Sequence, residues 1–114
     1  MSTIKVAVIE PNKTARFGEI IGNKLECLQR LVNGYIEVCY AYEEYGILLI
    51  VNEDGKLRGL TPNRTIVYEN GNIDVLCGTI VAVGAGEDDF VSLTDSQIKT
   101  IKELFNTRLK MFRI

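Results

Sequence analysis

The stretch Ile47–Val51 constrains the fold most, because every residue in it is apolar. A strand with one face in water alternates apolar and polar residues, whereas a strand covered on both faces is apolar throughout. The run is also too short to cross a bilayer as a helix. We therefore predict a buried strand at Ile47–Val51, with the rest of the chain packed around it.

Neighbouring segments supply further strands. Tyr35–Tyr42 alternates in hydropathy and is followed by a turn, so it should pair with Ile47–Val51 as an antiparallel hairpin. Asp54-Gly55 is a strong turn signal, which predicts that Lys56–Leu60 folds back as a third strand of a meander. Two other segments also have strand character, namely Ile4–Glu10 and Ile73–Val83.

Two segments predict helices. Leu25, Leu28 and Val32 recur at helical spacing, and Asn33-Gly34 is a typical helix stop, so the first helix should end at about Val32. Near the C-terminus, Thr94 and Gln97 form the pattern of a capping box, which marks the start of the last helix. We expect residues 106–114 to extend that helix.

These elements predict one α+β domain over residues 1–114, with a mainly antiparallel sheet of about five strands and helices packed on one face. The length is that of a single domain, and 25% charged residues is ordinary for a globular protein.

Charge and cysteine content narrow the function classes. A net charge of −2 and a pI near 5.2 argue against duplex nucleic acid as a partner, because phosphate binding needs a basic surface. The three cysteines are well separated among apolar residues, which is typical of free thiols in a reducing compartment, so we expect the cytoplasm. Neither a signal peptide nor a membrane-spanning segment is expected.

Catalytic patterns are weak. The chain has no histidine, and its cysteines lack an obvious base. Glu87-Asp88-Asp89 does not have the spacing of a calcium loop, and Gly84-Ala85-Gly86 lacks the context of a phosphate-binding fingerprint. Positive residues near the C-terminus, at Arg108, Lys110 and Arg113, have a helix-dipole explanation. We expect no enzyme activity, no metal and no cofactor.

The candidate ligand-binding residues lie in and near the polar stretch Asn52–Arg64. Arg64 has a planar fork suited to phosphate or carboxylate, and Pro62 should stiffen the loop that carries Thr61, Asn63 and Arg64. Asn52 could contribute an amide, and Tyr35 a stacking surface. The alternative is that both asparagines cap nearby backbone. We also predict that Thr61–Arg64 leaves the sheet.

An ordered series of short motifs runs through the chain: Gly34–Val38, Asn52–Leu57, Gly59-Leu60, Pro62–Arg64, Gly78-Thr79 and Phe90–Asp95. Together they resemble the domain-of-unknown-function family three-eight-four-six, small proteins encoded largely by phages and mobile elements of bacteria. The similarity spans Ile4 to Phe105. It implies a phage-like accessory protein that acts in the host cytoplasm, and it transfers no catalytic residues.

Three functional hypotheses follow. The first is a non-enzymatic protein that sequesters a small anionic ligand, such as a nucleotide immune signal, at a site that could lie between two copies of the chain. The second is a protein–protein inhibitor or adaptor that docks on a host protein through a sheet edge or the C-terminal helix. The third is hydrolysis of a nucleotide signal, which the poor catalytic patterns disfavour.

Overall fold

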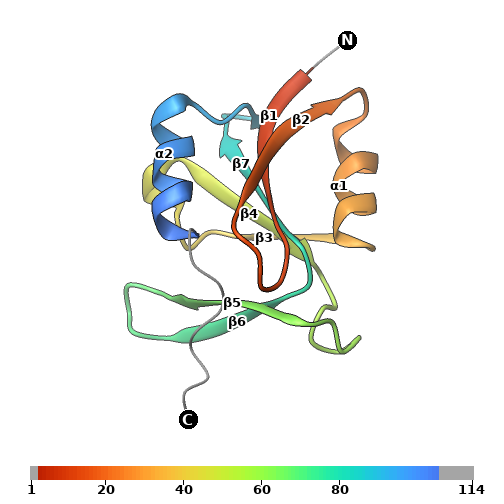
Figure 1. Ribbon diagram of the computed structural model, residues 1–114, viewed down its shortest axis with the longest axis vertical. Coiled ribbons are helices and arrows are strands. Elements are labelled where there is room, and N and C mark those ends of the chain that lie inside the picture. The colour runs from red at the N-terminus through yellow and green to blue at the C-terminus, as the bar shows by residue number, and fades with distance from the viewer. Residues whose placement is uncertain (1–2, 106–114) are drawn as a thin grey trace.

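A computed structural model describes residues 3–105, in which strands dominate and two helices flank the sheet (Figure 1). The strands are β1 (Thr3–Ile9), β2 (Arg16–Ile21), β3 (Ile36–Cys39), β4 (Ile47–Asn52), β5 (Pro62–Val67), β6 (Ile73–Cys77), β7 (Ile80–Ala85) and β8 (Phe90–Val91). The helices are α1 (Lys24–Val32), α2 (Asp95–Leu104) and the short 3-10 helix η1 (Glu43–Tyr45).

The main sheet is antiparallel throughout. Its strand order is β2-β1-β7-β4-β3, and β8 adds to β7. β4 lies between β7 and β3 and is wholly buried, with Leu49 opposite Ala82 of β7 and Ile50 opposite Val38 of β3. β5 and β6 form a separate antiparallel pair. The α+β class, the mainly antiparallel sheet and the C-terminal second helix are therefore confirmed.

Both faces of the sheet are covered. On one face, Leu49 packs in a cluster with Ile101 and Phe105 at the α2 end and with Ile66 and Leu76 of the β5–β6 pair. On the other face, the cluster consists of different strand residues, such as Val6 and Ile50, packed with Leu28 and Val32 of α1. Figure 1 shows the two helices on opposite sides of the sheet. The expectation that both helices cover one face is wrong, because alternate residues of β4 bury themselves on both sides.

Local signals placed the helix ends correctly. α1 ends at Val32, and Asn33 adopts the left-handed conformation at φ 62° that ends many helices. At α2, the Thr94 hydroxyl accepts from the Gln97 backbone N–H, and the Gln97 side chain accepts from the Thr94 N–H. The Gln97 amide also donates to the carbonyl of Gly46 at 2.9 Å, which ties the start of α2 to the loop before β4.

The middle of the chain differs from the sequence prediction. Lys56–Leu60 is not a strand, because residues 53–59 form successive turns. The Arg58 N–H donates to the Asp54 carbonyl, and the Leu60 N–H donates to the Gly55 carbonyl. These local bonds take backbone groups that a strand would have offered to β4. The β3–β4 hairpin is present as predicted.

The strands β2, β5 and β8 were not predicted, and Ile73–Val83, predicted as one strand, is divided into β6 and β7. β2 was not predicted, because Arg16–Ile21 is exposed at five of its positions and buries only Ile20, which leaves no alternation. The segment Thr61–Arg64 leaves the main sheet, as predicted, but from Pro62 onward it forms β5, which pairs with β6 in a separate two-stranded sheet. The predicted helical extension over 106–114 and its basic residues lie outside the residues that the structure describes.

Candidate functional site

Asn63 is a structural residue at an irregular point of β5. The pairing of β5 with β6 shifts register between Pro62 and Arg64, and the Asn63 side chain turns into the interior with no exposed surface. Its amide donates to the carbonyls of Ile9 at 2.8 Å and Gly78 at 2.7 Å. Asn63 therefore joins β5 to the end of β1 and to the β6–β7 turn.

Arg64 lies beside it and is also buried, at 7% exposure. Its Nη1 donates to the Asn63 carbonyl and to Asn63 Oδ1, and its Nη2 donates to the Lys13 carbonyl at 2.6 Å. The guanidinium carbon lies 5.8 Å from the ring centroid of Phe105, within range of a cation–π interaction. Burial lowers the pKa of Arg64 from its ordinary value. We call Asn63 and Arg64 the polar clamp, because they hold the β5–β6 pair against the main sheet.

Asn52 also satisfies backbone groups. Its amide donates to the carbonyls of Val32 at 3.0 Å and Asn33 at 3.1 Å, at the end of α1, where carbonyls lack helical partners. Its Oδ1 accepts from the Asp54 N–H at 2.8 Å. A Cβ at Gly34 would lie 2.6 Å from the Asn52 amide nitrogen, so any larger residue there would displace the Asn52 side chain. These contacts fit the alternative that the asparagines cap backbone.

The other two candidate residues are exposed but do not come together. The Thr61 carbonyl accepts from the Gly78 N–H at 2.7 Å, and the side chain lies on the surface. Tyr35 is 72% exposed, and its carbonyl accepts from the Glu53 N–H. The structure thus places the predicted site residues in three separate settings, and it brings only Asn63 and Arg64 into direct contact.

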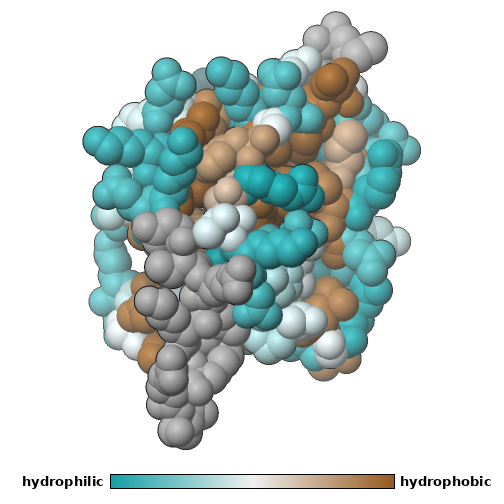
Figure 2. All heavy atoms as spheres, in the orientation of Figure 1, coloured by the Kyte–Doolittle hydropathy of each residue, from teal (hydrophilic) through white to brown (hydrophobic). Residues whose placement is uncertain are grey.

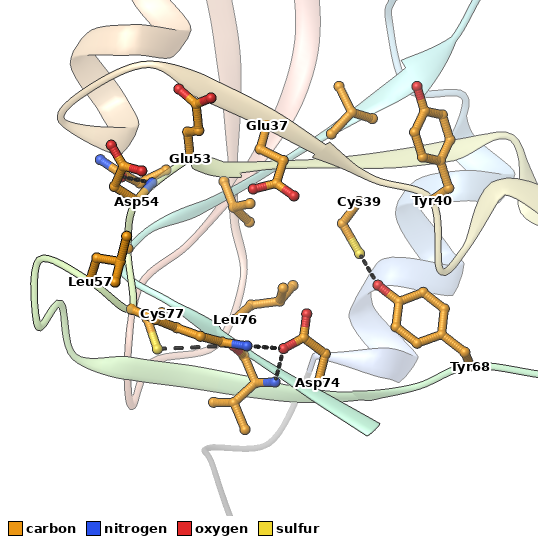
Figure 3. A pocket seen from close by; sticks show the side chains of 16 residues that line it. Glu37, Cys39, Tyr40, Glu53, Asp54, Leu57, Tyr68, Asp74, Leu76 and Cys77 are labelled. Carbon is orange, nitrogen blue, oxygen red and sulfur yellow. Dashed lines mark hydrogen bonds and ion pairs between the residues drawn. The ribbon is translucent and has the colours of Figure 1, made fainter. Parts of the chain in front are cut away.

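A different part of the molecule forms a cleft of about 480 Å³ (Figure 3). One wall is β3 and the residue after it, the other is β6, and the turns after β4 close one end. We call this the acidic cleft. Its lining residues are Glu37, Val38, Cys39, Tyr40, Val51, Asn52, Glu53, Asp54, Gly55, Lys56, Leu57, Tyr68, Asp74, Val75, Leu76 and Cys77.

Carboxylates dominate the charge of this cleft. Among the described residues of its lining, Lys56 is the only basic one, and its Nζ forms an ion pair and hydrogen bond with Asp74 Oδ1, which raises the pKa of Lys56. Within residues 3–105, Glu37, Glu53 and Asp54 form no ion pair. The cleft therefore carries a net negative charge and suits a cation better than an anion.

The cleft also contains neutral polar groups. Cys39 Sγ and the Tyr68 hydroxyl lie 3.4 Å apart, and this hydrogen bond together with burial raises the pKa of Tyr68, so the phenol stays neutral at physiological pH. Cys39 is buried, while Cys27 and Cys77 are half-buried, and all three are free thiols. In the described part of the chain, no group of three His, Cys, Asp or Glu could hold a metal ion.

Of the residues that line the acidic cleft, sequence reasoning named only Asn52 as a ligand-binding candidate. Glu53 and Asp54 were interpreted only as part of a turn, although they stand in the most polar stretch of the chain. Glu37 and Asp74 come from strands far apart in the sequence, and no local pattern indicates that β3 and β6 form facing walls.

From residue 3 to 105, no helix is long and apolar enough to span a membrane.

Comparison with known proteins identifies the family. The family model described as a domain of unknown function, DUF3846, matches residues 4–106, which is most of the chain. The comparisons with curated proteins and with solved structures gave no match. The match covers the whole range of the short motifs from Gly34 to Asp95. The chain is a member of the DUF3846 family.

Proposed function

We propose that this chain is a non-enzymatic binding module whose acidic cleft takes an extended, lysine- or arginine-rich segment of another protein. One observation carries the proposal: Glu37, Glu53 and Asp54 line the cleft, and none of them has a cationic partner within residues 3–105. Unpaired carboxylates along a cleft create a negative potential that attracts cations and repels anions.

The backbone next to the cleft supports an extended ligand. β3 is at one end of the strand order, and no strand in the described chain pairs with its outer edge. An edge strand offers unpaired N–H and C=O groups, which peptides use when they add a strand to a sheet. Leu57 also lines the cleft and is 90% exposed, so it offers apolar surface beside the charges. A peptide with alternating basic and apolar residues fits this combination.

This function corresponds to the inhibitor or adaptor hypothesis, in which a sheet edge docks on a partner. In the phage or mobile-element setting that the resemblance implies, the partner would be a host protein. Sequestration of a small anionic ligand has less support, because Asn52, Asn63 and Arg64 donate to the protein's own backbone. That hypothesis remains a prediction, and the binding experiment includes it.

The direct test is isothermal titration with three kinds of ligand. The first is an unstructured peptide that alternates lysine and valine, the second has glutamate in place of lysine, and the third is a panel of cyclic and ADP-ribose-type nucleotides. We expect heat with the lysine peptide only, and weaker binding as salt rises, because exposed charges are screened. Binding of a nucleotide with no binding of the lysine peptide would instead support the anionic-ligand hypothesis.

A matched pair of variants locates the binding. Glu37→Gln/Glu53→Gln/Asp54→Asn removes the unpaired carboxylates of the cleft, whereas Glu87→Gln/Asp88→Asn/Glu103→Gln makes the same charge change outside the cleft. Loss of three charge contacts worth about 0.5 kcal/mol each should weaken peptide binding about tenfold. The control should bind as the native chain does. An equal loss in both variants would show a general charge effect and reject the cleft as the site.

A further inference from the structure

The β5–β6 pair turns one face to the core and the other away from it. Ile66 and Leu76 are buried in the core, so strand alternation places their neighbours on the opposite side of the pair. We call that side the outer face. It consists of two cross-strand pairs of β-branched residues: Val67 opposite Ile73, and Thr65 opposite Val75.

This outer face leaves apolar groups in solvent. Val67 is 63% exposed and Ile73 is 67% exposed. In Figure 2, hydrophobic surface is visible at the lower left, over the end of the pair where β5 and β6 are joined. A two-stranded sheet is marginally stable unless other elements pack on it. A segment that covered the outer face would therefore stabilise the pair.

One polar atom of the outer face lacks a partner. Thr65 Oγ1 is shielded from solvent and has no hydrogen-bond partner within residues 3–105. Shielded hydroxyl groups are bonded in most proteins, and leaving one unbonded costs free energy. A polar group from a covering segment would remove that cost.

The described chain ends beside this pair. Phe105 packs in the same core cluster as Ile66, and the Arg64 guanidinium carbon lies 5.8 Å from its ring centroid. In the described chain, β5 pairs only with β6, so its other edge is free. Residues 106–114 follow, and an extended segment of that length spans about 30 Å, against about 20 Å for β5. The segment is long enough to pass β5 and lie along the outer face.

The composition of residues 106–114 suits an apolar face at the surface. The segment has no acidic residue, and its apolar and basic residues are Leu109, Met111, Phe112 and Ile114, and Arg108, Lys110 and Arg113. From Arg108 to Met111 the two kinds alternate, so an extended backbone presents apolar groups on one side and charges on the other. A tethered segment also has an effective concentration of about millimolar, which favours it over a second copy of the chain.

We infer that residues 106–114 cover the outer face of the β5–β6 pair in their own chain. Their apolar side chains pack on Val67 and Ile73, their basic side chains remain in solvent, and a polar group of the segment bonds to the Thr65 hydroxyl. β5 carries the polar clamp and β6 forms one wall of the acidic cleft, so the segment supports both. The inference does not depend on the proposed function.

Amide hydrogen exchange of the full chain, resolved by residue, tests this contact. The test variant replaces the apolar residues of the segment: Leu109→Gln/Met111→Gln/Phe112→Gln/Ile114→Gln. We expect the amides of β5 and β6 to exchange at least about fivefold faster, because the pair opens locally without its cover. The amides of β1 and β7 should change much less. Unchanged exchange in β5 and β6 overturns the inference.

The matched control replaces the basic residues of the same segment, Arg108→Gln/Lys110→Gln/Arg113→Gln. It should leave exchange in β5 and β6 as in the native chain, because these side chains remain in solvent. An acceleration equal to that of the test variant would show an effect of charge and overturn the role of the apolar side chains.

A double-mutant cycle shows whether the segment touches the outer face itself. Val67→Thr/Ile73→Thr keeps β-branched side chains on the strands and removes their apolar ends. In that background the test variant should accelerate exchange by less than about twofold, because the contact is already lost. Fully additive effects overturn the inference. A dimer in sedimentation velocity that Val67→Thr/Ile73→Thr dissociates would assign the outer face to a second copy and also overturn it.

Discussion

The polar clamp and the acidic cleft contain similar kinds of side chain but differ in what surrounds them. Asn63 and Arg64 are almost fully buried; the Asn63 amide donates to the carbonyls of Ile9 and Gly78, and Arg64 donates to the Lys13 carbonyl. Glu37, Glu53 and Asp54 are exposed, and none of the three has a basic partner in the described chain. Buried polar groups must be bonded within the protein, whereas exposed ones remain available to a ligand. The comparison therefore assigns stability to the clamp and binding to the cleft.

Replacement of Asn63 should have the largest effect on stability. Asn63→Ala leaves the carbonyls of Ile9 and Gly78 and one donor of Arg64 without their partner, and each buried unsatisfied group costs about 1–3 kcal/mol. We expect the free energy of unfolding in urea to fall by about 4 kcal/mol. Asn72→Ala, on the exposed turn between β5 and β6, is the control and should change it little. If Asn63→Ala and Asn72→Ala lowered the unfolding free energy equally, the buried amide of Asn63 would contribute no more to stability than the exposed amide of Asn72.

Arg64→Lys tests whether the guanidinium itself is required. Lysine keeps the positive charge, but it cannot donate to Asn63 and to the Lys13 carbonyl in the same fork geometry. We expect a loss of about 2–3 kcal/mol in unfolding free energy, and little change in peptide affinity for the folded fraction. Arg16→Lys is the exposed control. A stable Arg64→Lys protein with altered ligand binding would instead support Arg64 as the ligand-binding residue that the sequence predicted.

Substitutions of Asn52 test how much the cap at the end of α1 contributes to stability. Asn52→Ala removes both donors and the acceptor, which should cost about 2 kcal/mol. Asn52→Asp keeps the acceptor for the Asp54 N–H but cannot donate to the carbonyls of Val32 and Asn33. If the donors provide most of the stability, thermal unfolding will show Asn52→Asp to be as unstable as Asn52→Ala. A near-native Asn52→Asp would show that the turn after β4 is the part that matters.

Substitution of Thr94 tests how much a cap on the surface contributes to stability. Thr94→Ala loses the bond from the Gln97 N–H to the hydroxyl, so the unfolding free energy should fall by about 1 kcal/mol. Gln97 also donates to the carbonyls of Tyr45 and Gly46, so Gln97→Ala should cost more than Thr94→Ala. The control is Ser96→Ala, because Ser96 lies two residues after Thr94 in the first turn of α2 and its side chain has no capping role. If Thr94→Ala lowered the unfolding free energy more than Asn63→Ala, the buried polar clamp would not contribute more to stability than an exposed cap.

The smallest effect should come from an exposed ion pair. Lys24 Nζ donates to Asp89 Oδ2 and lowers the pKa of that carboxyl below its ordinary value of 3.8. A lowered pKa in the folded state stabilises the protein above the unfolded-state pKa, and that contribution is lost as pH falls. Asp89→Asn should therefore reduce stability slightly at about pH 7 and not at all at about pH 2. Urea titrations at both pH values measure this difference. A larger loss of unfolding free energy in acid than at neutral pH would contradict the lowered pKa of Asp89.

Much of the local structure could be predicted from the sequence. The Thr94–Gln97 capping box, the left-handed Asn33 after α1 and the apolar β4 all depend on residues close to one another in the chain. β2 was not predictable in the same way, because an edge strand that buries one residue has no apolar period. The segment after Asp54-Gly55 was mispredicted because successive turns and a folded-back strand begin with the same signal.

The candidate site could not be predicted, since its parts are assembled over long sequence separations. Glu37 and Asp74 face one cleft only after the β5–β6 pair has packed on the main sheet. Asn63 looked available in the sequence because an asparagine after a proline suits both a cap and a ligand contact. Its carbonyl partner at Ile9 is remote in sequence, so no local pattern distinguishes the two roles.

The sequence by itself determined the α+β class, the buried β4, the two helices with the stop after α1 and the capping box of α2, and the family, because these follow from hydropathy periods and short motifs. Only the tertiary structure decided which polar side chains are buried and which are exposed. Burial is a property of the packed chain: the β5–β6 pair covers Asn63 and Arg64 against the sheet and leaves the carboxylates of the acidic cleft in water. The same packing separates stability from binding in this protein.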